Sequence, residues 1–184
     1  LDSNQDLGQA IELLEKETIT FDKHIKRRDF IETFAAFICI PAWIFGLLKA
    51  DNWVETAGLV ILLIACIVIP VILWKTRVSE SDKLVGIKTF LSQEKIKVEK
   101  QIKLLSNVAL WYIAPLFSGI ILGTLGANID DSGQLHLDSH MWTYYGFVLV
   151  LAIGIYFLNK QGVKKKYQPI LDKINQQLAD LEKV

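Results

Sequence analysis

Two carboxylates, Asp29 and Glu32, lie where a charged stretch of the chain gives way to a long apolar one. Arg28 and Glu32 are four residues apart, so a helix places them on one face, where they can form an ion pair. If a helix begins nearby, both acids also complement its positive N-terminal dipole. The functional alternative is that Glu32, at a membrane edge, pairs with a basic residue of another helix or marks an ion entrance.

The other residues with reactive side chains form no recognisable catalytic or metal-binding pattern. His136, Asp138 and His140 occur together in "HLDSH", which we interpret as a polar loop in preference to a metal site. Cys39 and Cys66 fall in two separate apolar segments, where a thiol packs as a small apolar group. The sequence contains no Walker loop, dinucleotide-binding glycine pattern, HExxH motif or nucleophile elbow. We therefore expect no catalytic residue, no cofactor and no metal, and hence no enzyme.

Four apolar segments must position these residues. The chain has 184 residues, of which 52% are hydrophobic and 22% charged, and the two kinds are segregated into blocks. The apolar blocks are 30–48, 56–74, 108–127 and 141–158. Each is close to the ~20 residues that a helix needs to cross a bilayer. We expect an all-α protein with four transmembrane helices in two hairpins.

Lysine and arginine are unevenly distributed among the connecting segments. All except Lys49 lie in 1–33, 75–107 and 159–184, whereas the two other connections are acidic. The positive-inside rule then places both termini and the middle segment in the cytoplasm. The basic residues are spread along the segments and do not form a nucleic-acid footprint, so we expect membrane lipid as a partner and no nucleic acid.

The charged segments carry helical stripes of apolar residues. In the first, the stripe from Leu7 to Ile25 alternates spacings of four and three, and in the second a comparable stripe is interrupted by Glu94. We expect three cytoplasmic amphipathic helices that pack into one bundle. The side chains expected to point inward are Leu14, Phe21, Leu91, Val98, Ile174 and Leu178. In the alternative, one stripe is kept for a protein partner or a second copy.

Small residues in the third apolar segment indicate a close helix contact. Gly119 and Gly123 are four residues apart, which lets another helix approach, either in the same chain or in a second one. The segments around Pro41 and Pro115 can also be aligned, which suggests an internal duplication with parallel halves. The rival explanation is that proline is common in membrane helices.

Three stretches carry a resemblance to known proteins: "FDKHIKRRDFIETFAAFICIPAW", "FLSQEKIKVEKQIKLLSNVALWYIAPLFSGIILGTLG" and "LNKQGVKKKYQPILDKINQQLADLE". They resemble a family of small bacterial inner-membrane proteins of unknown activity, often encoded beside extracytoplasmic-function sigma factors. The resemblance covers most of the chain and implies a multi-pass protein of the bacterial inner membrane. The gene neighbourhood implies signalling or envelope stress by association, and the family supplies no functional residue.

We interpret the chain as one integrated membrane domain. Residues 1–78 hold the N-terminal amphipathic helix and the first transmembrane hairpin, and residues 79–184 hold the remaining helices. We expect a non-enzymatic accessory, scaffolding or regulatory subunit that contacts a protein partner or a second copy. The residues expected at such contacts are Leu14, Phe21, Arg28, Glu32, Gly119 and Gly123. The alternative is an oligomeric ion channel or small transporter, lined by neutral polar residues such as Asn107, Ser118 and Thr124.

Overall fold

The computed structural model describes residues 2–77, 86–130 and 132–182, and their side chains from residue 13 onward except 14 and 15. The side chain of Leu14 and the first part of the Leu7–Ile25 stripe lie outside the described residues, so the inward direction of Leu14 stays a prediction. Helices hold 89% of the structure described. The only β pairing within it is an isolated bridge between Ile129 and Leu135.

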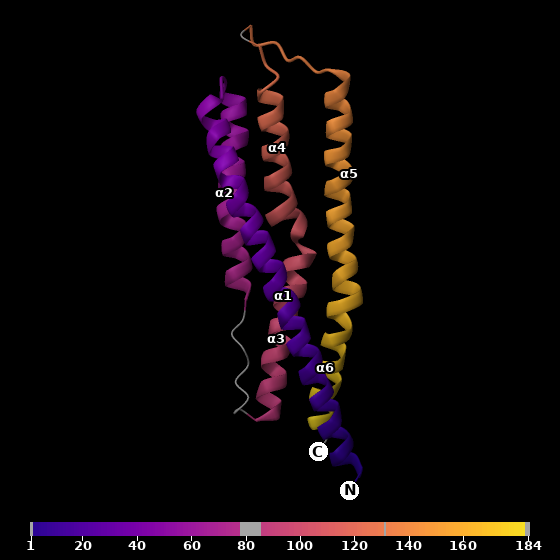
Figure 1. The fold of residues 1–184 in the computed structure, drawn as a ribbon. Helices are drawn as coiled ribbons and strands as arrows, with labels where there is room; N and C mark the ends of the chain where they lie inside the picture. Colours follow the sequence, from indigo (N-terminus) through magenta and orange to yellow (C-terminus); the bar gives the residue numbers. More distant parts are fainter. Residues whose placement is uncertain (1, 78–85, 131, 183–184) are drawn as a thin grey trace.

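The described helices form four long rods and their extensions (Figure 1). The α-helices are α1 (Asp2–Lys49), α2 (Trp53–Thr76), α3 (Ile87–Ser106), α4 (Ala114–Gly126), α5 (Ser139–Gly162) and α6 (Gln168–Leu181). Two π-helical turns, η1 (Ala109–Ile113) and η2 (Val163–Tyr167), lead from α3 into α4 and from α5 into α6.

Four helical stretches of the described chain are long and apolar enough to cross a membrane. They are Lys16–Lys49, Trp53–Thr76, Ala109–Gly126 and Ser139–Leu181. This finding confirms the all-α chain with four candidate membrane helices that the sequence predicts. In α2, 44% of the most apolar window is buried, against 6% in α1 and in α5. The second span is therefore central, and the first and fourth are peripheral.

The amphipathic and apolar parts of the first rod form one uninterrupted helix. α1 runs for 48 residues with Pro41 inside it, which corresponds to a length of about 72 Å. Asp29 and Glu32 therefore lie in the interior of a helix, and the interpretation that they complement an N-terminal dipole is wrong. A buried or lipid-facing helix tolerates a proline such as Pro41 when neighbouring groups satisfy the freed carbonyl.

Each π-helical turn ends two residues before a proline. η1 precedes Pro115 and η2 precedes Pro169. Proline has no N–H and its ring clashes with the carbonyl four residues earlier, so a regular α-helical turn is strained there. The N–H of Ala114 instead donates to Ala109 O, and that of Gln168 to Val163 O, which widens each turn. Pro41 and Pro115 thus lie in different local structures, and the internal duplication stays a prediction.

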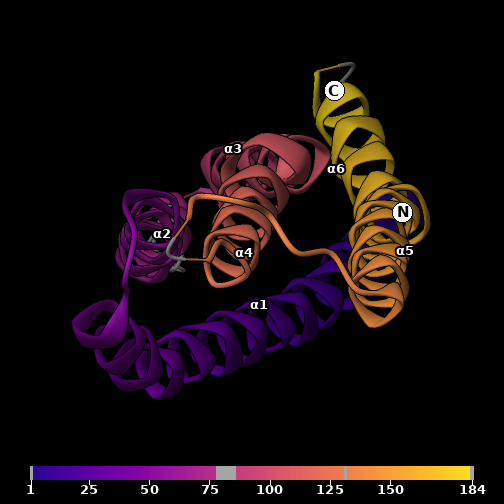
Figure 2. The same ribbon diagram turned by 90° about the horizontal axis from the view of Figure 1, so that it is seen from above.

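In the view from above, α4 lies between α2 and α5 (Figures 1 and 2). Seen from above, α2, α4 and α5 follow one another across the molecule, and α1 crosses in front of them from the side of α5 to the side of α2. Both termini lie at one end, together with α3, α6 and the first half of α1. We call this end, comprising residues 13–28 of α1 with α3, η2 and α6, the base.

The base has its own apolar core. Phe21, Leu91, Val98 and Ile174 are buried in one cluster with Ile25, and Leu178 packs against it. The ring of Phe21 meets that of Tyr167 edge to face, with the centroids 4.8 Å apart. The structure thus brings together five of the six side chains that the sequence directs inward. The side of the membrane on which the base lies stays a prediction.

Glycines set the close packing of α2 on α4. A Cβ added to Gly58 would collide with the backbone of Gly123, and one added to Gly126 would collide with the backbone of Glu55. A Cβ on Gly119 would come within 2.7 Å of Leu62 Cγ. The contact made by Gly119 and Gly123 is therefore with α2 of the same chain; a methyl group does not fit at Gly119, whereas at Gly123 the nearest α2 atoms would be 4.0 Å from it.

Candidate functional site

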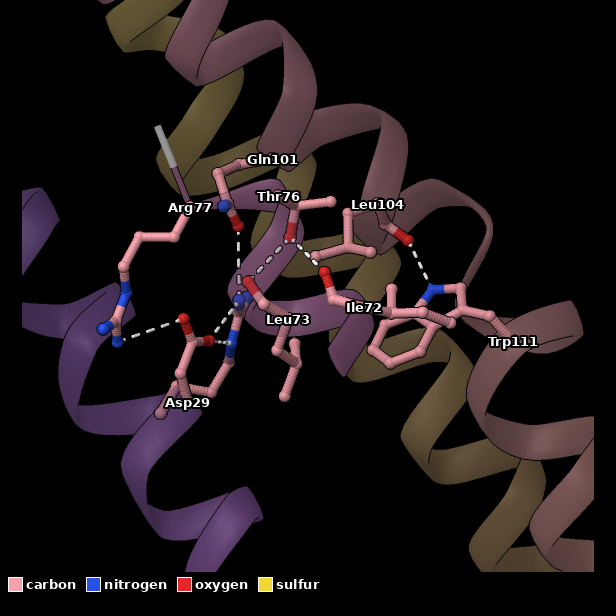
Figure 3. Close-up of polar contacts among 9 residues, drawn as sticks. Asp29, Ile72, Leu73, Thr76, Arg77, Gln101, Leu104 and Trp111 are labelled. Carbon is pink, nitrogen blue, oxygen red and sulfur yellow. Dashed lines mark hydrogen bonds and ion pairs between the residues drawn. The ribbon is translucent and has the colours of Figure 1, made fainter. Parts of the chain in front are cut away.

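A buried carboxylate joins the base to the membrane helices. The Asp29 side chain is 0% exposed. Arg28 Nη2 and Nε donate to Asp29 Oδ1 at 2.8 and 3.1 Å, and Arg77 Nη2, beyond the end of α2, is 3.5 Å from Oδ2 (Figure 3). A fully buried carboxylate costs several kcal/mol unless charged hydrogen-bond donors surround it, and here two guanidinium groups do so.

The same arginine extends the cluster to α3. Arg28 Nη2 also donates to Gln101 Oε1 at 3.2 Å, and Gln101 is 1% exposed (Figure 3). One side chain of α1 thus links the end of α2 to the middle of α3. The guanidinium is directed to Asp29 and Gln101, whereas the sequence pairs it with Glu32.

A cavity lies beside this cluster, one helical turn further along α1. Its volume is about 210 Å³, and α1, α2, α3, η1 and α5 all contribute to its wall. The lining residues are Arg28, Glu32, Leu73, Leu105, Val108, Trp111, Tyr112, Ile155 and Asn159. Glu32 Oε2 and Arg28 Nη1 are buried and have no hydrogen-bond partner among the described residues. One basic and one acidic residue of the lining therefore each carry a buried polar atom that the described chain leaves unsatisfied.

A second set of buried charges lies within the base. Lys97 Nζ donates to Asp22 Oδ2 and to Glu94 Oε1, both at 2.8 Å. Lys97 and Glu94 are 4% and 2% exposed. Burial by itself lowers the pKa of Lys97, but the hydrogen bonds to the two carboxylates outweigh it and raise that pKa above 10.5. Glu94, which interrupts the apolar stripe of α3, is thus a member of the core with its own cationic partner.

An open groove separates α1 from η2 and α6 on the surface of the base. Its volume is about 750 Å³. Its apolar lining comes from Leu13, Phe21, Tyr167, Pro169 and Ile170. Its charged lining consists of Lys16, Glu17, Arg28, Lys166 and Lys173, with His24 beside them. Lys173 Nζ is 2.6 Å from Glu17 Oε1, so the one acid among the described lining residues is paired with a lysine of the same groove.

The "HLDSH" stretch follows a polar turn at the opposite end from the base, and His136 is its only member bonded to that turn in the described structure. Asp130 Oδ1 accepts hydrogen bonds from the Ser132 hydroxyl and the N–H groups of Ser132 and Gln134, and Asp130 Oδ2 is 2.8 Å from His136 Nε2. These bonds, with the Ser132 hydroxyl first, lower the pKa of Asp130. Among the described residues, no three His, Cys, Asp or Glu side chains are grouped closely enough to hold a metal ion.

The neutral polar residues proposed for a pore mostly bond within their own chain. Ser118 Oγ donates to Pro115 O at 3.1 Å. Thr124 Oγ1 lies 2.7 Å from Ile120 O and 3.1 Å from the Tyr145 hydroxyl. Both hydroxyls bond to helix carbonyls, and that of Thr124 also links α4 to α5.

Sequence reasoning missed the partners of the buried charges. The sequence pairs Arg28 with Glu32 and gives Asp29 a helix-dipole role. In the structure Asp29 contacts Arg77, 48 positions away, and Arg28 contacts Gln101, 73 positions away. The sequence does contain a signal for Arg77. Arg77 follows one apolar block and Asp29 precedes another, so both residues are expected at the same boundary of the membrane. Gln101 gave no such signal. Cys39 is half-buried and Cys66 is buried, and both thiols are free.

No protein-family model, no curated protein and no solved structure matches this chain, so its resemblance to the inner-membrane family stays a prediction.

Proposed function

We propose that this chain is a non-enzymatic membrane protein that works as an accessory or regulatory subunit and binds a protein partner through its base. The observation that carries the proposal is the groove between α1 and α6. The groove has a volume of about 750 Å³. Its aromatic and aliphatic lining is the kind of surface on which the apolar face of a partner helix packs.

The charges of the groove specify the chemistry of that partner. Among the described lining residues, basic side chains (Lys16, Arg28, Lys166 and Lys173) are more numerous than acidic ones, and Arg28 and Lys173 also pair with Asp29 and Glu17. A groove of this kind attracts an amphipathic segment whose polar face is acidic, because complementary charge steers association and disfavours basic competitors. The expected partner is therefore a protein with an acidic amphipathic helix near the membrane surface.

The proposal places the base in the cytoplasm of a bacterial inner membrane. The support is the distribution of lysine and arginine, which favours the base as the inner side. An acidic cytoplasmic segment of another protein would reach the groove without crossing the bilayer.

Photo-crosslinking in intact cells tests the groove as a docking site. A photoreactive residue at Thr20, which lines the groove, should form a crosslink to a partner protein, and one at Leu149, exposed on α5, should not give the same product. The crosslinked segment, once mapped, should be an acidic amphipathic helix.

A charge-reversed pair of variants provides the control. Lys166→Glu, within the groove, should reduce the Thr20 crosslink, whereas Lys165→Glu makes the same change of charge at an exposed neighbour outside the lining and should leave it intact. Equal yields from the two variants, or a crosslinked segment that is basic, would remove the support for this function.

A further inference from the structure

The cavity beside Glu32 lies at the boundary between charged and apolar chain. Glu32 is the last charged residue of α1 before an uninterrupted apolar stretch that ends at Lys49. On α5, Asn159 lines the same cavity, and it is followed at once by Lys160, the first charged residue after that span. The two helices run in opposite directions, and both change between charged and apolar sequence at the level of the cavity. Phospholipid headgroups lie at such a boundary.

Two residues that line the cavity, the basic Arg28 and the acidic Glu32, each have an unsatisfied polar atom. Arg28 already bonds to Asp29 and Gln101 through Nε and Nη2, and its Nη1 is left over. Glu32 Oε2 is likewise buried without a hydrogen-bond partner among the described residues. A ligand that satisfies both must present an acceptor anion and a donor cation on one small group, because a lone cation or a lone anion leaves the other group bare.

The rest of the lining suits a group that is polar at one end only. Leu73, Leu105, Val108 and Ile155 supply apolar wall. The indole N–H of Trp111 is occupied by Leu104 O at 2.9 Å, so its ring acts as further apolar surface (Figure 3). Beyond the cavity, α1 and α5 diverge from one another (Figures 1 and 2). Both helices carry exposed apolar side chains there, on which hydrocarbon chains pack.

We propose that this cavity binds the phosphoethanolamine headgroup of a membrane phospholipid. Its phosphate accepts from Arg28 Nη1, and its primary ammonium donates to Glu32 Oε2. This inference is independent of the partner groove, which lies on the surface of the base. A choline headgroup has no N–H to give Glu32, and a glycerol headgroup has no cation, so both should bind less well.

Lipid retention by the full chain tests the proposal. The protein is transferred to mixed micelles that contain equal amounts of phosphatidylethanolamine, phosphatidylcholine and phosphatidylglycerol, and the lipids that remain bound are identified by native mass spectrometry. We expect about one phosphatidylethanolamine per chain, retained about tenfold or more over the others, as the loss of one charged hydrogen bond implies.

Three variants separate the cavity from general lipid binding. Glu32→Gln keeps the size of the side chain but removes its charge. It should abolish the preference for phosphatidylethanolamine over the other two lipids. Ile155→Trp should fill the cavity and displace the lipid while both charged groups remain. Glu55→Gln removes a carboxylate near the other end of α2, outside the lining, and should retain the preference. Thermal melting of each variant identifies any that fails to fold.

Water-soluble phosphoethanolamine distinguishes the source of the ligand. If the free headgroup displaces the lipid only at far higher concentration, the lipid is the ligand. If free phosphoethanolamine binds as tightly as the lipid, the cavity recognises the headgroup chemistry, but the proposal that its ligand is a membrane lipid is wrong. Equal retention of all three lipids, or a preference that survives both Glu32→Gln and Ile155→Trp in folded protein, overturns the proposal and leaves the volume to water.

Discussion

Asp29 and Lys97 are charged residues that the fold keeps almost entirely from solvent, and each has two charged partners. Removing one partner from a buried ionic group leaves the others without compensation, which costs far more than breaking an exposed pair. The base and its junction with the spans should therefore be sensitive to single conservative substitutions at these positions.

Replacing Lys97 with methionine keeps much of the side chain but leaves Glu94 buried without its cation. We expect the free energy of unfolding to fall by ~3–5 kcal/mol, the usual cost of a broken buried pair. Lys88→Met is the matched control, because Lys88 pairs with Glu182 at 3.5 Å and both side chains are 65% exposed; it should cost ~0–1 kcal/mol. Denaturation in detergent followed by circular dichroism measures both, and equal losses would contradict the assignment of Lys97 to the core.

The pKa of Lys97 predicts an alkaline limit to the stability of the base. Its value in the folded protein lies above the ordinary 10.5 because two carboxylates accept its hydrogen bonds. The stabilisation is therefore complete below 10.5 and is lost as the pH rises through the higher folded value. The stability gap between the wild type and Lys97→Met should narrow above pH 10.5. A gap of constant size in melts recorded over this range would show that the ion pair contributes no stability.

The buried polar residues mark the limit of prediction at this scale. Phe21, Val98 and Ile174 were predicted as inward side chains because their helical spacing depends on the local sequence alone. Lys97 and Gln101 follow the spacing of the buried face of α3, yet their polarity indicates a solvated one. Their burial depends on partners that only tertiary packing supplies, such as Asp22 for Lys97 and Arg28 for Gln101.

At the scale of elements, the closest packing occurs between α2 and α4. Gly58, Gly119 and Gly126 remove the Cβ atoms that would hold the two helices apart. Because the two helices lie so close, Asn52 both caps α2 and bonds to α4. Its Oδ1 accepts a hydrogen bond from Glu55 N at 2.9 Å, and its Nδ2 donates one to Gly126 O at 2.7 Å.

Gly58→Ala should separate α2 from α4, because the added methyl group meets the backbone of Gly123, which cannot move aside as a side chain can. We expect a loss of ~1–3 kcal/mol, the typical cost of overpacking. Gly146→Ala introduces the same methyl group in α5, where nothing lies within 4 Å, and should gain ~0.5–1 kcal/mol from helix propensity. Thermal melting in detergent compares the pair, and a Gly58→Ala variant as stable as Gly146→Ala would contradict this packing.

The elements were predictable from the sequence to different degrees. The four apolar blocks are long enough that composition alone identifies them. The π-helical turns were not predicted, because Pro115 and Pro169 indicate a disturbance of the helix but not its form. The continuity of the first amphipathic helix with the first span was not predicted either, because the charged and apolar segments were expected to be separate helices.

At the scale of the whole molecule, the orientation in the membrane is a prediction that labelling can settle. With Cys39 and Cys66 replaced by alanine, Ser132→Cys should react with an impermeant thiol reagent in intact cells. Ser92→Cys, in α3, should react only after lysis. The physical reason is that the base carries the lysines and arginines, which favour the cytoplasmic side. Labelling of Ser92→Cys without lysis would place the base outside and would overturn this orientation.

The uninterrupted course of α1 has a mechanical consequence. The helix is held near its middle, where Asp29 is enclosed by Arg28 and Arg77, with about 40 Å of helix on the side of the base and about 30 Å on the other. A stiff rod pivoting there works as a lever. If a partner in the groove tilted the whole rod about this point, the tip near Lys49 would move in the opposite direction by roughly three quarters of the distance, and α2, whose Leu59 lies against Gly46, would move with it. Binding of a partner in the groove would thereby shift the end of α1 at the other side of the membrane, without any change in the conformation of the helix itself.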